Sequence, residues 1–293
     1  MSRIAIAGLQ LDLPRTDNLD RIEREIDLVR QRFPWIELVV VGELAAFGPN
    51  TAHAQSMPGA AEQRFAAAAR RNDLWLVAGS VFERAGDRIY NTASVIDPSG
   101  EVVARYRKMF PFFPYEKGVT PGSEFVVFDI PHVGRFGVSI CYDMWFPETT
   151  RSLACMGAEV ILHPTMTNTI DRDVEMSIAR ANAAMNQCYF VDINVAGELG
   201  TGRSGIYGPG GEVICEAGGG REILTVDLDL EAVRSARHRG WHSIVQPLKS
   251  FRDSTVVFPP YAPDRRQSQY LDSLGPLAMP ARHAHNASDT KKT

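Results

Sequence analysis

Short apolar segments alternate along the chain with longer segments in which apolar residues recur every three or four positions. A short apolar run is typical of a β-strand, and the longer period is typical of an amphipathic helix. The unbroken run at 36–41 predicts a strand covered on both faces. The pattern predicts strands over residues 4–11, 36–41, 74–81, 88–96, 101–107, 125–130, 136–140, 159–162, 189–195, 205–207, 212–215 and 223–226. It predicts helices through Ile22, Ile26, Val29 and Phe33, and over 60–72, 147–156, 170–185 and 230–238.

Helix boundaries are indicated by residues that cap or interrupt backbone hydrogen bonding. Thr16 or Asp17 is a suitable cap for the first helix. Pro147 suits the first position of a later helix, and Gly157 stands just past its end. The helix over 170–185 is predicted from a cap and an apolar stripe: Asn168 or Thr169, then Ile170, Val174, Ile178, Ala181 and Met185.

Strands interleaved with helices predict an α/β layered fold in which helices cover the sheets. No low-complexity linker divides residues 1–240, which we expect to form one domain. The regular pattern fails after Trp241, so residues 241–280 are expected to be an irregular extension that packs on the domain or on a partner subunit. The polar segment 281–293 is expected to be a disordered tail.

Composition excludes several classes of protein. The net charge of −4 argues against a nucleic-acid-binding protein, which usually has a basic surplus. No segment approaches the roughly 18 apolar residues of a membrane span, and the N-terminal run is too short for a signal peptide. The four cysteines lack CxxC spacing, and the histidines lack metal-binding spacing. These features predict a reduced, cytoplasmic chain without a metal site.

Three predicted strands lead to ionisable side chains: the carboxylate of Glu43, the ammonium of Lys108 and the thiol of Cys141. Because ligands in open α/β sheets bind beyond the carboxyl ends of strands, these groups are expected to meet. A thiol nucleophile, a base and a cation are the components of an acyl-transfer site. Each residue also has a structural interpretation: Cys141 as a small buried hydrophobe, Glu43 as a helix cap or arginine partner, and Lys108 as a solvated edge residue.

The segments around these residues resemble the signature blocks of the nitrilase superfamily, the carbon–nitrogen hydrolases. The blocks are Gly-Glu-Leu at Glu43, Tyr-Arg-Lys-Met-Phe-Pro at Lys108, and Val-Ser-Ile-Cys-Tyr-Asp-Met-Trp-Phe-Pro-Glu at Cys141. Tyr-Asn-Thr-Ala at 90–93 and Ser-Gly-Ile-Tyr-Gly-Pro-Gly-Gly at 204–211 also resemble family segments. The resemblance covers roughly residues 3–240. It implies an α-β-β-α sandwich of two mixed β-sheets covered by helices.

The resemblance also implies roles for individual residues. Cys141 would be the nucleophile, Glu43 the general base and Lys108 the cation that stabilises the oxyanion. Glu116 occupies the place of an additional glutamate that positions substrate or shuttles a proton. The backbone N–H of Tyr142, directly after the nucleophile, would be a second oxyanion donor. The family chemistry needs no cofactor or metal.

The resemblance favours an amidase that hydrolyses a small carboxamide to an acid and ammonia. Trp145 stands where omega-amidase-like members usually have an arginine, so a planar cation is replaced by an apolar ring. Together with the aromatic residues near Lys108, Phe113 among them, this favours a neutral or aromatic amide. His163 and Met166 are further pocket candidates, although such a histidine is more often hydrogen-bonded within the structure, and such aromatic clusters are more often core.

Several alternatives stay open on the sequence alone. Nitrile hydrolysis, hydrolysis of N-carbamoyl amines and acyl transfer use the same residues in this family. A non-catalytic binding protein of the same fold is the more distant alternative. Family members usually dimerise through the helices predicted here at 147–156 and 170–185, which would join two sandwiches into an α-β-β-α-α-β-β-α arrangement. A homodimer or higher homo-oligomer is therefore expected.

Overall fold

The computed structural model describes residues 2–261 and 268–279. The chain divides into two compact units, the first formed by Met1–Pro111 with Val119–Ser254 and the second by Phe112–Gly118 with Thr255–Thr293. The first unit holds both main sheets and continues past residue 240. The predicted tail, 281–293, lies outside the described residues.

The first sheet is mixed and has seven strands in the order β15-β1-β3-β4-β6-β5, with β7 pairing on β6. β1 is parallel to β3 and antiparallel to β15, and β6 and β7 form an antiparallel pair. The strands are β1 (Arg3–Gln10), β3 (Leu38–Val41), β4 (Trp75–Val77), β5 (Val81–Ala85), β6 (Arg88–Ile96), β7 (Val102–Arg107) and β15 (Glu222–Asp229).

The second sheet is also mixed, with six strands in the order β14-β13-β11-β10-β9-β8. Its central strands β9, β10 and β11 are parallel, so their carboxyl ends point the same way. The strands are β8 (Val126–Ile130), β9 (Gly134–Val138), β10 (Val160–Thr165), β11 (Tyr189–Asn194), β13 (Gly205–Tyr207) and β14 (Val213–Glu216). A separate parallel pair is formed by β2 (Asp12–Leu13) and β12 (Ala196–Gly197).

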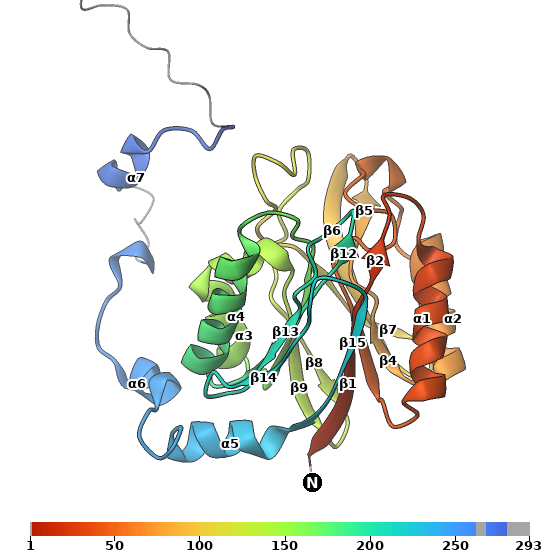
Figure 1. Ribbon diagram of the computed structural model, residues 1–293. Helices are drawn as coiled ribbons and strands as arrows, with labels where there is room; N and C mark the ends of the chain where they lie inside the picture. The colour runs from red at the N-terminus through yellow and green to blue at the C-terminus, as the bar shows by residue number, and fades with distance from the viewer. Residues whose placement is uncertain (1, 262–267, 280–293) are drawn as a thin grey trace, which may run out of the picture. The chain divides into compact units, whose positions relative to one another are not determined.

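Helices cover the outer faces of the two sheets. In Figure 1, α1 and α2 lie on the side of β1 and β4, and α3 and α4 lie on the side of the second sheet. The two mixed sheets between helical layers confirm the predicted α-β-β-α sandwich. The helices are α1 (Leu19–Arg32), α2 (Ala60–Asn72), α3 (Pro147–Cys155), α4 (Arg172–Asn186), α5 (Leu230–Arg239) and α6 (Pro247–Asp253), with short 3-10 turns at Thr51–His53 and Cys141–Trp145.

The unbroken apolar run of β3 is explained by its place between two cores. Leu38 and Val40 belong to the core between the sheets, whereas Val39 and Val41 face the core beneath α1 and α2. Alternate side chains of a strand point to opposite faces, so a strand covered on both sides needs apolar residues at every position.

Some element boundaries differ from those predicted. The segment predicted as one strand over 74–81 divides into β4 and β5, because Gly79 between them adopts φ +72°. The helix predicted from residue 170 begins at Arg172, and its cap position is Asp171 rather than Asn168 or Thr169. For α1 the cap position is Asn18, although the Asp17 carboxylate does accept from the N–H of Leu19.

The second unit contains little regular structure within its described residues. It has a 3-10 turn at Pro259–Tyr261 and the short helix α7 (Gln269–Ser273). In its segment 112–118, the N–H groups of Tyr115 and Glu116 donate to the carbonyl of Phe112, which closes a compact turn.

Candidate active site

Glu43, Lys108 and Cys141 each follow the carboxyl end of a strand in the first unit. Glu43 follows β3 and Lys108 follows β7, both in the first sheet, while Cys141 follows β9 of the second sheet. Lys108 Nζ donates to Glu43 Oε1 at 2.8 Å, and the charges of both residues act on the Cys141 thiol. The three groups that the sequence placed at strand ends are thus brought together where the two sheets meet.

A close approach of backbones brings Glu43 to the second sheet. A Cβ at Gly42 would lie 2.7 Å from Cγ1 and 2.9 Å from the nitrogen of Val195, so only glycine fits there. The next residue, Glu43, donates its N–H to the carbonyl of Thr165 at 3.1 Å. This hydrogen bond joins the end of β3 to the end of β10.

Asn91, on β6, connects Glu43 and Lys108. Its backbone carbonyl accepts the N–H of Lys108 at 2.8 Å, and its side-chain Nδ2 donates to Glu43 Oε1 at 2.7 Å. Glu43, Asn91 and Lys108 are all buried, and a buried carboxylate requires such donors. In the sequence, Asn91 lies in the Tyr-Asn-Thr-Ala segment that resembles a family segment, but the resemblance assigns it no role.

The nucleophile candidate lies on a strained turn. Cys141 has φ +46°, a left-handed conformation that L-residues other than glycine rarely adopt, and it begins a 3-10 turn that leads into α3. Leu44, directly after Glu43, has φ +47°. Such conformations persist where the surrounding structure imposes them, and they cluster at active sites.

The imidazole of His163 is hydrogen-bonded to this turn. Its Nε2 lies 3.2 Å from the carbonyl oxygen of Cys141, and its Nδ1 lies 2.7 Å from Ser139 Oγ. Burial lowers the pKa of His163 to about 4, so the imidazole is neutral at physiological pH. Nε2–H then donates to Cys141, and Nδ1 accepts from Ser139. Because His163 is fully buried and both nitrogens are engaged, its position fits the structural interpretation.

Burial also acts on the thiol itself. Loss of solvation raises the pKa of Cys141 well above its usual range, and the negative charge of Glu43 adds to this, while the positive charge of Lys108 opposes it. The sulfur is therefore protonated at neutral pH. For this sulfur to act as a nucleophile, a nearby base must accept its proton, and Glu43 is the carboxylate whose charge acts most strongly on the thiol.

A buried polar cluster lies beside the sulfur. Thr167 Oγ1 is 3.9 Å from Cys141 Sγ, and its side chain is hydrogen-bonded to Glu175 of α4. Arg172 pairs with Glu175 at 3.3 Å and with Asp192 at 2.6 Å. These contacts depend on residues from distant segments, so Thr167 could not be identified from the sequence pattern.

The predicted substrate-binding residues of the first unit lie around this turn. The Tyr142 and Trp145 rings have centroids 6.3 Å apart, and the Trp145 side chain is 37% exposed. Met166 is half-buried and packs beside Leu44 and Phe82. Trp145 thus has apolar surface available to a ligand, whereas Met166 packs in the small apolar cluster that contains Leu44, the residue after Glu43.

Phe113 and Glu116 belong to the second unit. The Glu116 carboxylate accepts the N–H of Phe112, so it is held against its own turn. The Phe112 and Tyr115 rings stack with centroids 4.8 Å apart. The segment thus holds Glu116 in a folded turn, and its predicted role in the reaction stays a prediction.

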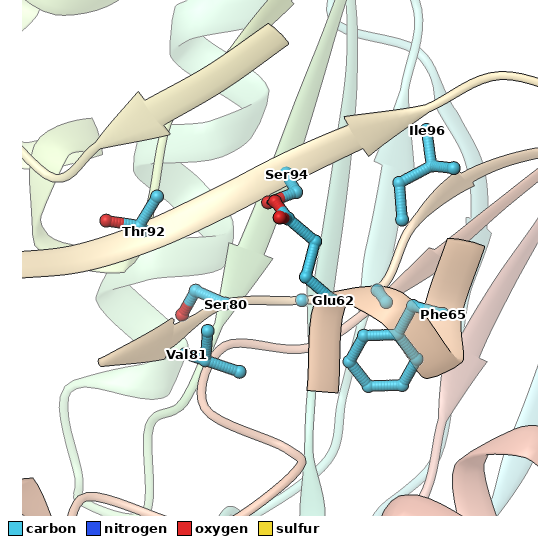
Figure 2. Close-up of a pocket in the computed structure, with 9 residues that line it drawn as sticks. Glu62, Phe65, Ser80, Val81, Thr92, Ser94 and Ile96 are labelled. Atoms are coloured by element: carbon cyan, nitrogen blue, oxygen red, sulfur yellow. The ribbon is translucent and has the colours of Figure 1, made fainter. Parts of the chain in front are cut away.

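A separate hollow between α2 and the first sheet is structural. Figure 2 shows the Glu62 carboxyl group beside Ser94 in this hollow, and Ser94 Oγ donates to it. Glu62 also forms a two-point ion pair with Arg105 at 2.8 and 2.9 Å. The cavity volume is about 10 Å³, at most enough for one water molecule. This carboxylate is therefore fully engaged and has no room for a substrate.

Across residues 2–261 and 268–279, no group of three or more His, Cys, Asp or Glu side chains could hold a metal ion. No helix in the same residues has the length and apolarity needed to cross a membrane.

The chain is similar to known carbon–nitrogen hydrolases. The family model described as carbon-nitrogen hydrolase matches residues 3–238. Omega-amidase NIT2 of Homo sapiens is 28% identical over 259 residues, which cover 81% of this chain and 92% of that protein. Omega-amidase NIT2 of Danio rerio is 27% identical over 257 residues, with 81% and 91% covered.

Solved structures show the same similarity. Saccharomyces cerevisiae Nit3, a member of branch 10 of the nitrilase superfamily, aligns with a TM-score of 0.75 and 30% identity over 81% of this chain and 94% of that one. A mutant amidase from Nesterenkonia sp. AN1, with the acetamide moiety of fluoroacetamide covalently added at the active-site cysteine, aligns with a TM-score of 0.72 and 28% identity. That match covers 81% of this chain and 96% of the amidase.

Proposed function

This chain belongs to the nitrilase superfamily of carbon–nitrogen hydrolases, enzymes with a cysteine nucleophile, and we propose that it is an amidase that converts a small carboxamide to a carboxylic acid and ammonia. The observation that carries the proposal is the buried Glu43–Lys108 ion pair whose charges act on the Cys141 thiol. A base, a cation and a nucleophile in one buried site match the requirements of acyl transfer.

In the first half-reaction, Cys141 Sγ attacks the amide carbonyl carbon while Glu43 takes the thiol proton. The resulting oxyanion accepts hydrogen bonds from Lys108 Nζ and from the backbone N–H of Tyr142. When the tetrahedral adduct collapses, the C–N bond breaks and Glu43 returns the proton to the leaving nitrogen. Ammonia departs, and the acyl group remains on Cys141 as a thioester.

In the second half-reaction, water attacks the thioester carbonyl and gives a proton to Glu43. The same two donors stabilise the second oxyanion. Collapse breaks the C–S bond, and the sulfur recovers its proton from Glu43 as the carboxylic acid leaves. Glu116 is proposed to position the amide or to relay a proton, in line with the family resemblance.

The proposed substrate is a small neutral or aromatic amide. Trp145, exposed beside Tyr142, offers aromatic surface, and Met166 offers an apolar side chain. Phe113 is included in this proposal on the sequence pattern alone. A dicarboxylic monoamide would need a cation for its free carboxylate, and Trp145 provides none. The acetamide moiety on the Nesterenkonia amidase is consistent with small aliphatic amides as substrates of a similar site.

Ammonia release from a panel of compounds tests the proposal. The panel contains acetamide, propionamide, benzamide, succinamic acid, the matching nitriles and N-carbamoyl amines, and it is repeated with hydroxylamine as acyl acceptor. We expect turnover of the neutral amides and none by Cys141→Ala, which removes one sulfur atom and little packing volume. Preference for nitriles, N-carbamoyl amines or acyl transfer would replace the amidase assignment, and normal turnover by folded Cys141→Ala would refute the site.

We further propose that a second copy of the chain covers α3 and α4. The apolar positions predicted as one stripe of the long helix lie largely outside the core: Ile170, Val174 and Met185 are 93%, 48% and 44% exposed. Apolar surface of this kind marks an interaction site. Light scattering should show a dimer or larger assembly, and Val174→Glu should shift it toward monomer. A monomeric wild-type chain would refute this proposal.

A further inference from the structure

The buried carboxylate of Asp143 accepts hydrogen bonds from three donors. Asp143 lies two residues after Cys141, and its side chain is fully buried. Oδ2 accepts from the N–H of Ile140 at 2.8 Å and from the hydroxyl of Tyr106 at 2.7 Å. Oδ1 accepts from the N–H of Phe110 at 2.9 Å.

These donors come from the two segments that carry the proposed nucleophile and cation. Ile140 directly precedes Cys141, whereas Tyr106 and Phe110 stand two residues before and two residues after Lys108. The Asp143 carboxylate is therefore hydrogen-bonded to residues on both sides of Lys108 and to the residue before Cys141.

The two segments have no common sheet to align them. Lys108 follows β7 of the first sheet, and Cys141 follows β9 of the second. The hydrophobic effect resists separation of the sheets but is non-directional, so by itself it does not specify the alignment of two polar groups. Directional hydrogen bonds can fix such a relationship, and three of them meet at Asp143.

We infer that Asp143 is a positioning residue that holds the Cys141 turn at a fixed place relative to Lys108. It does not touch the reacting atoms. Its function is to keep the sulfur and the lysine ammonium aligned, so that the oxyanion forms within reach of Nζ. The inference rests on the proposed function, because it takes Cys141 and Lys108 as nucleophile and cation.

The ionised form of Asp143 is the one that suits this role, since a carboxylate accepts all three hydrogen bonds. Burial raises the pKa of Asp143 to about 6, against the lowering effects of the Tyr106 hydroxyl, the Ile140 and Phe110 N–H groups and the Lys108 charge. The group is therefore predominantly ionised at pH 7 and above.

Asp143→Asn tests the inference with little change in shape. Either orientation of the amide places its NH₂ against a backbone N–H, of Ile140 or of Phe110, so one connection is lost. We expect kcat on the best amide to fall on the order of 10- to 100-fold, because small misplacements of reacting groups are this costly, while KM stays within about twofold.

A second readout measures the alignment without any substrate. Lys108→Met should raise the pH midpoint of Cys141 alkylation by iodoacetamide, because the lysine charge lowers the pKa of Cys141. If Asp143 aligns the two residues, this change should be at least halved when Lys108→Met is made in the Asp143→Asn background. A merely structural role would leave this coupling intact in folded protein.

Glu159→Gln is the matched control. Glu159 is another buried carboxylate that bonds to a backbone N–H, of Arg135, and to Arg234. It directly precedes β10, at the opposite end of that strand from Thr165. We expect it to lower stability but to leave kcat and the coupling unchanged.

The outcomes separate cleanly. Unchanged kcat in folded Asp143→Asn, or a fall in kcat with unchanged coupling, overturns the inference. If Asp143→Asn does not fold, Tyr106→Phe, which removes one donor and keeps the ring, decides by the same two readouts. If the wild-type enzyme releases no ammonia from any amide, the proposed function fails, and the alkylation coupling still decides whether Asp143 aligns the two residues.

Discussion

Lys108 Nζ and Glu43 Oε1 are 2.8 Å apart, and the two side chains are only 1% and 2% exposed. In such a pair each charge compensates the other, and removal of one partner leaves an uncompensated buried charge. In the proposed mechanism the pair therefore couples stability to catalysis: the carboxylate proposed as base is held by the cation proposed to stabilise the oxyanion.

We expect Lys108→Met to lower stability and activity together. The unpaired Glu43 carboxylate should reduce the free energy of unfolding by about 3–5 kcal/mol, measured by urea denaturation. Loss of the oxyanion donor should lower kcat at least on the order of 100-fold in folded protein.

The double variant Glu43→Gln with Lys108→Met is the control for this prediction. It removes both charges, so most of the lost stability should return, while activity should stay absent. If the double variant is no more stable than Lys108→Met alone, the stability effect does not come from the broken ion pair.

Glu43→Gln alone should distinguish the proposed role of Glu43 as a base from the effect of its charge on the pKa of Cys141. The negative charge of Glu43 raises the pKa of Cys141, so its removal should move the alkylation midpoint of Cys141 to lower pH. Turnover should nevertheless fall on the order of 100-fold or more, because no base accepts the thiol proton. Iodoacetamide labelling followed by mass spectrometry, across a pH series, measures the midpoint.

An upward shift of that midpoint in Glu43→Gln would contradict this assignment of charges. Cys155 offers an internal reference for labelling in the same experiment, since it is an exposed thiol at the end of α3.

The order of elements and the three strand-end residues could be predicted from the sequence because both depend on local pattern. Apolar runs set the strands, and the carboxyl ends of strands bring Glu43, Lys108 and Cys141 to one place. Asn91 and Asp143 could not be assigned in this way. Their roles consist of hydrogen bonds to segments far along the chain, and a polar residue in a sequence does not indicate its tertiary partner.

The long helix α4 shows a second reason why the structure could not be fully predicted from the sequence. Its periodic apolar positions identified a helix, but the face toward the sheet includes Arg172, Glu175 and Asn182. Arg172 is buried because it pairs with Asp192 on β11. The periodicity therefore predicted the presence of the helix but not which of its faces packs against the sheet. A buried ion pair stands where an apolar contact was expected.

Trp145→Ala should change substrate preference more than stability. The ring is 37% exposed and tilted against Tyr142, so its removal leaves the core intact but takes away apolar surface beside the nucleophile. We expect kcat/KM for benzamide to fall about tenfold relative to acetamide, in line with the loss of apolar contact worth about 1–2 kcal/mol. Identical preference profiles in wild type and Trp145→Ala would exclude contact between this ring and the substrate.

The neutral state of His163 should appear as a pH dependence of stability. Burial lowers its pKa from 6.5 to about 4, so between these values the unfolded chain binds a proton that the native protein does not. Unfolding is therefore favoured as the pH falls through this window, by about 2 kcal/mol at pH 5 relative to pH 7. Asp143, whose pKa is raised to about 6, acts in the opposite direction in wild type and can mask the effect.

His163→Gln keeps a donor for the Cys141 carbonyl and leaves Asp143 in place, so the difference between the two proteins isolates the imidazole. Urea unfolding of both at pH 7 and pH 5 should show that the stability of wild type relative to His163→Gln decreases on acidification. A difference that is constant or grows at pH 5 would mean that the native imidazole is protonated.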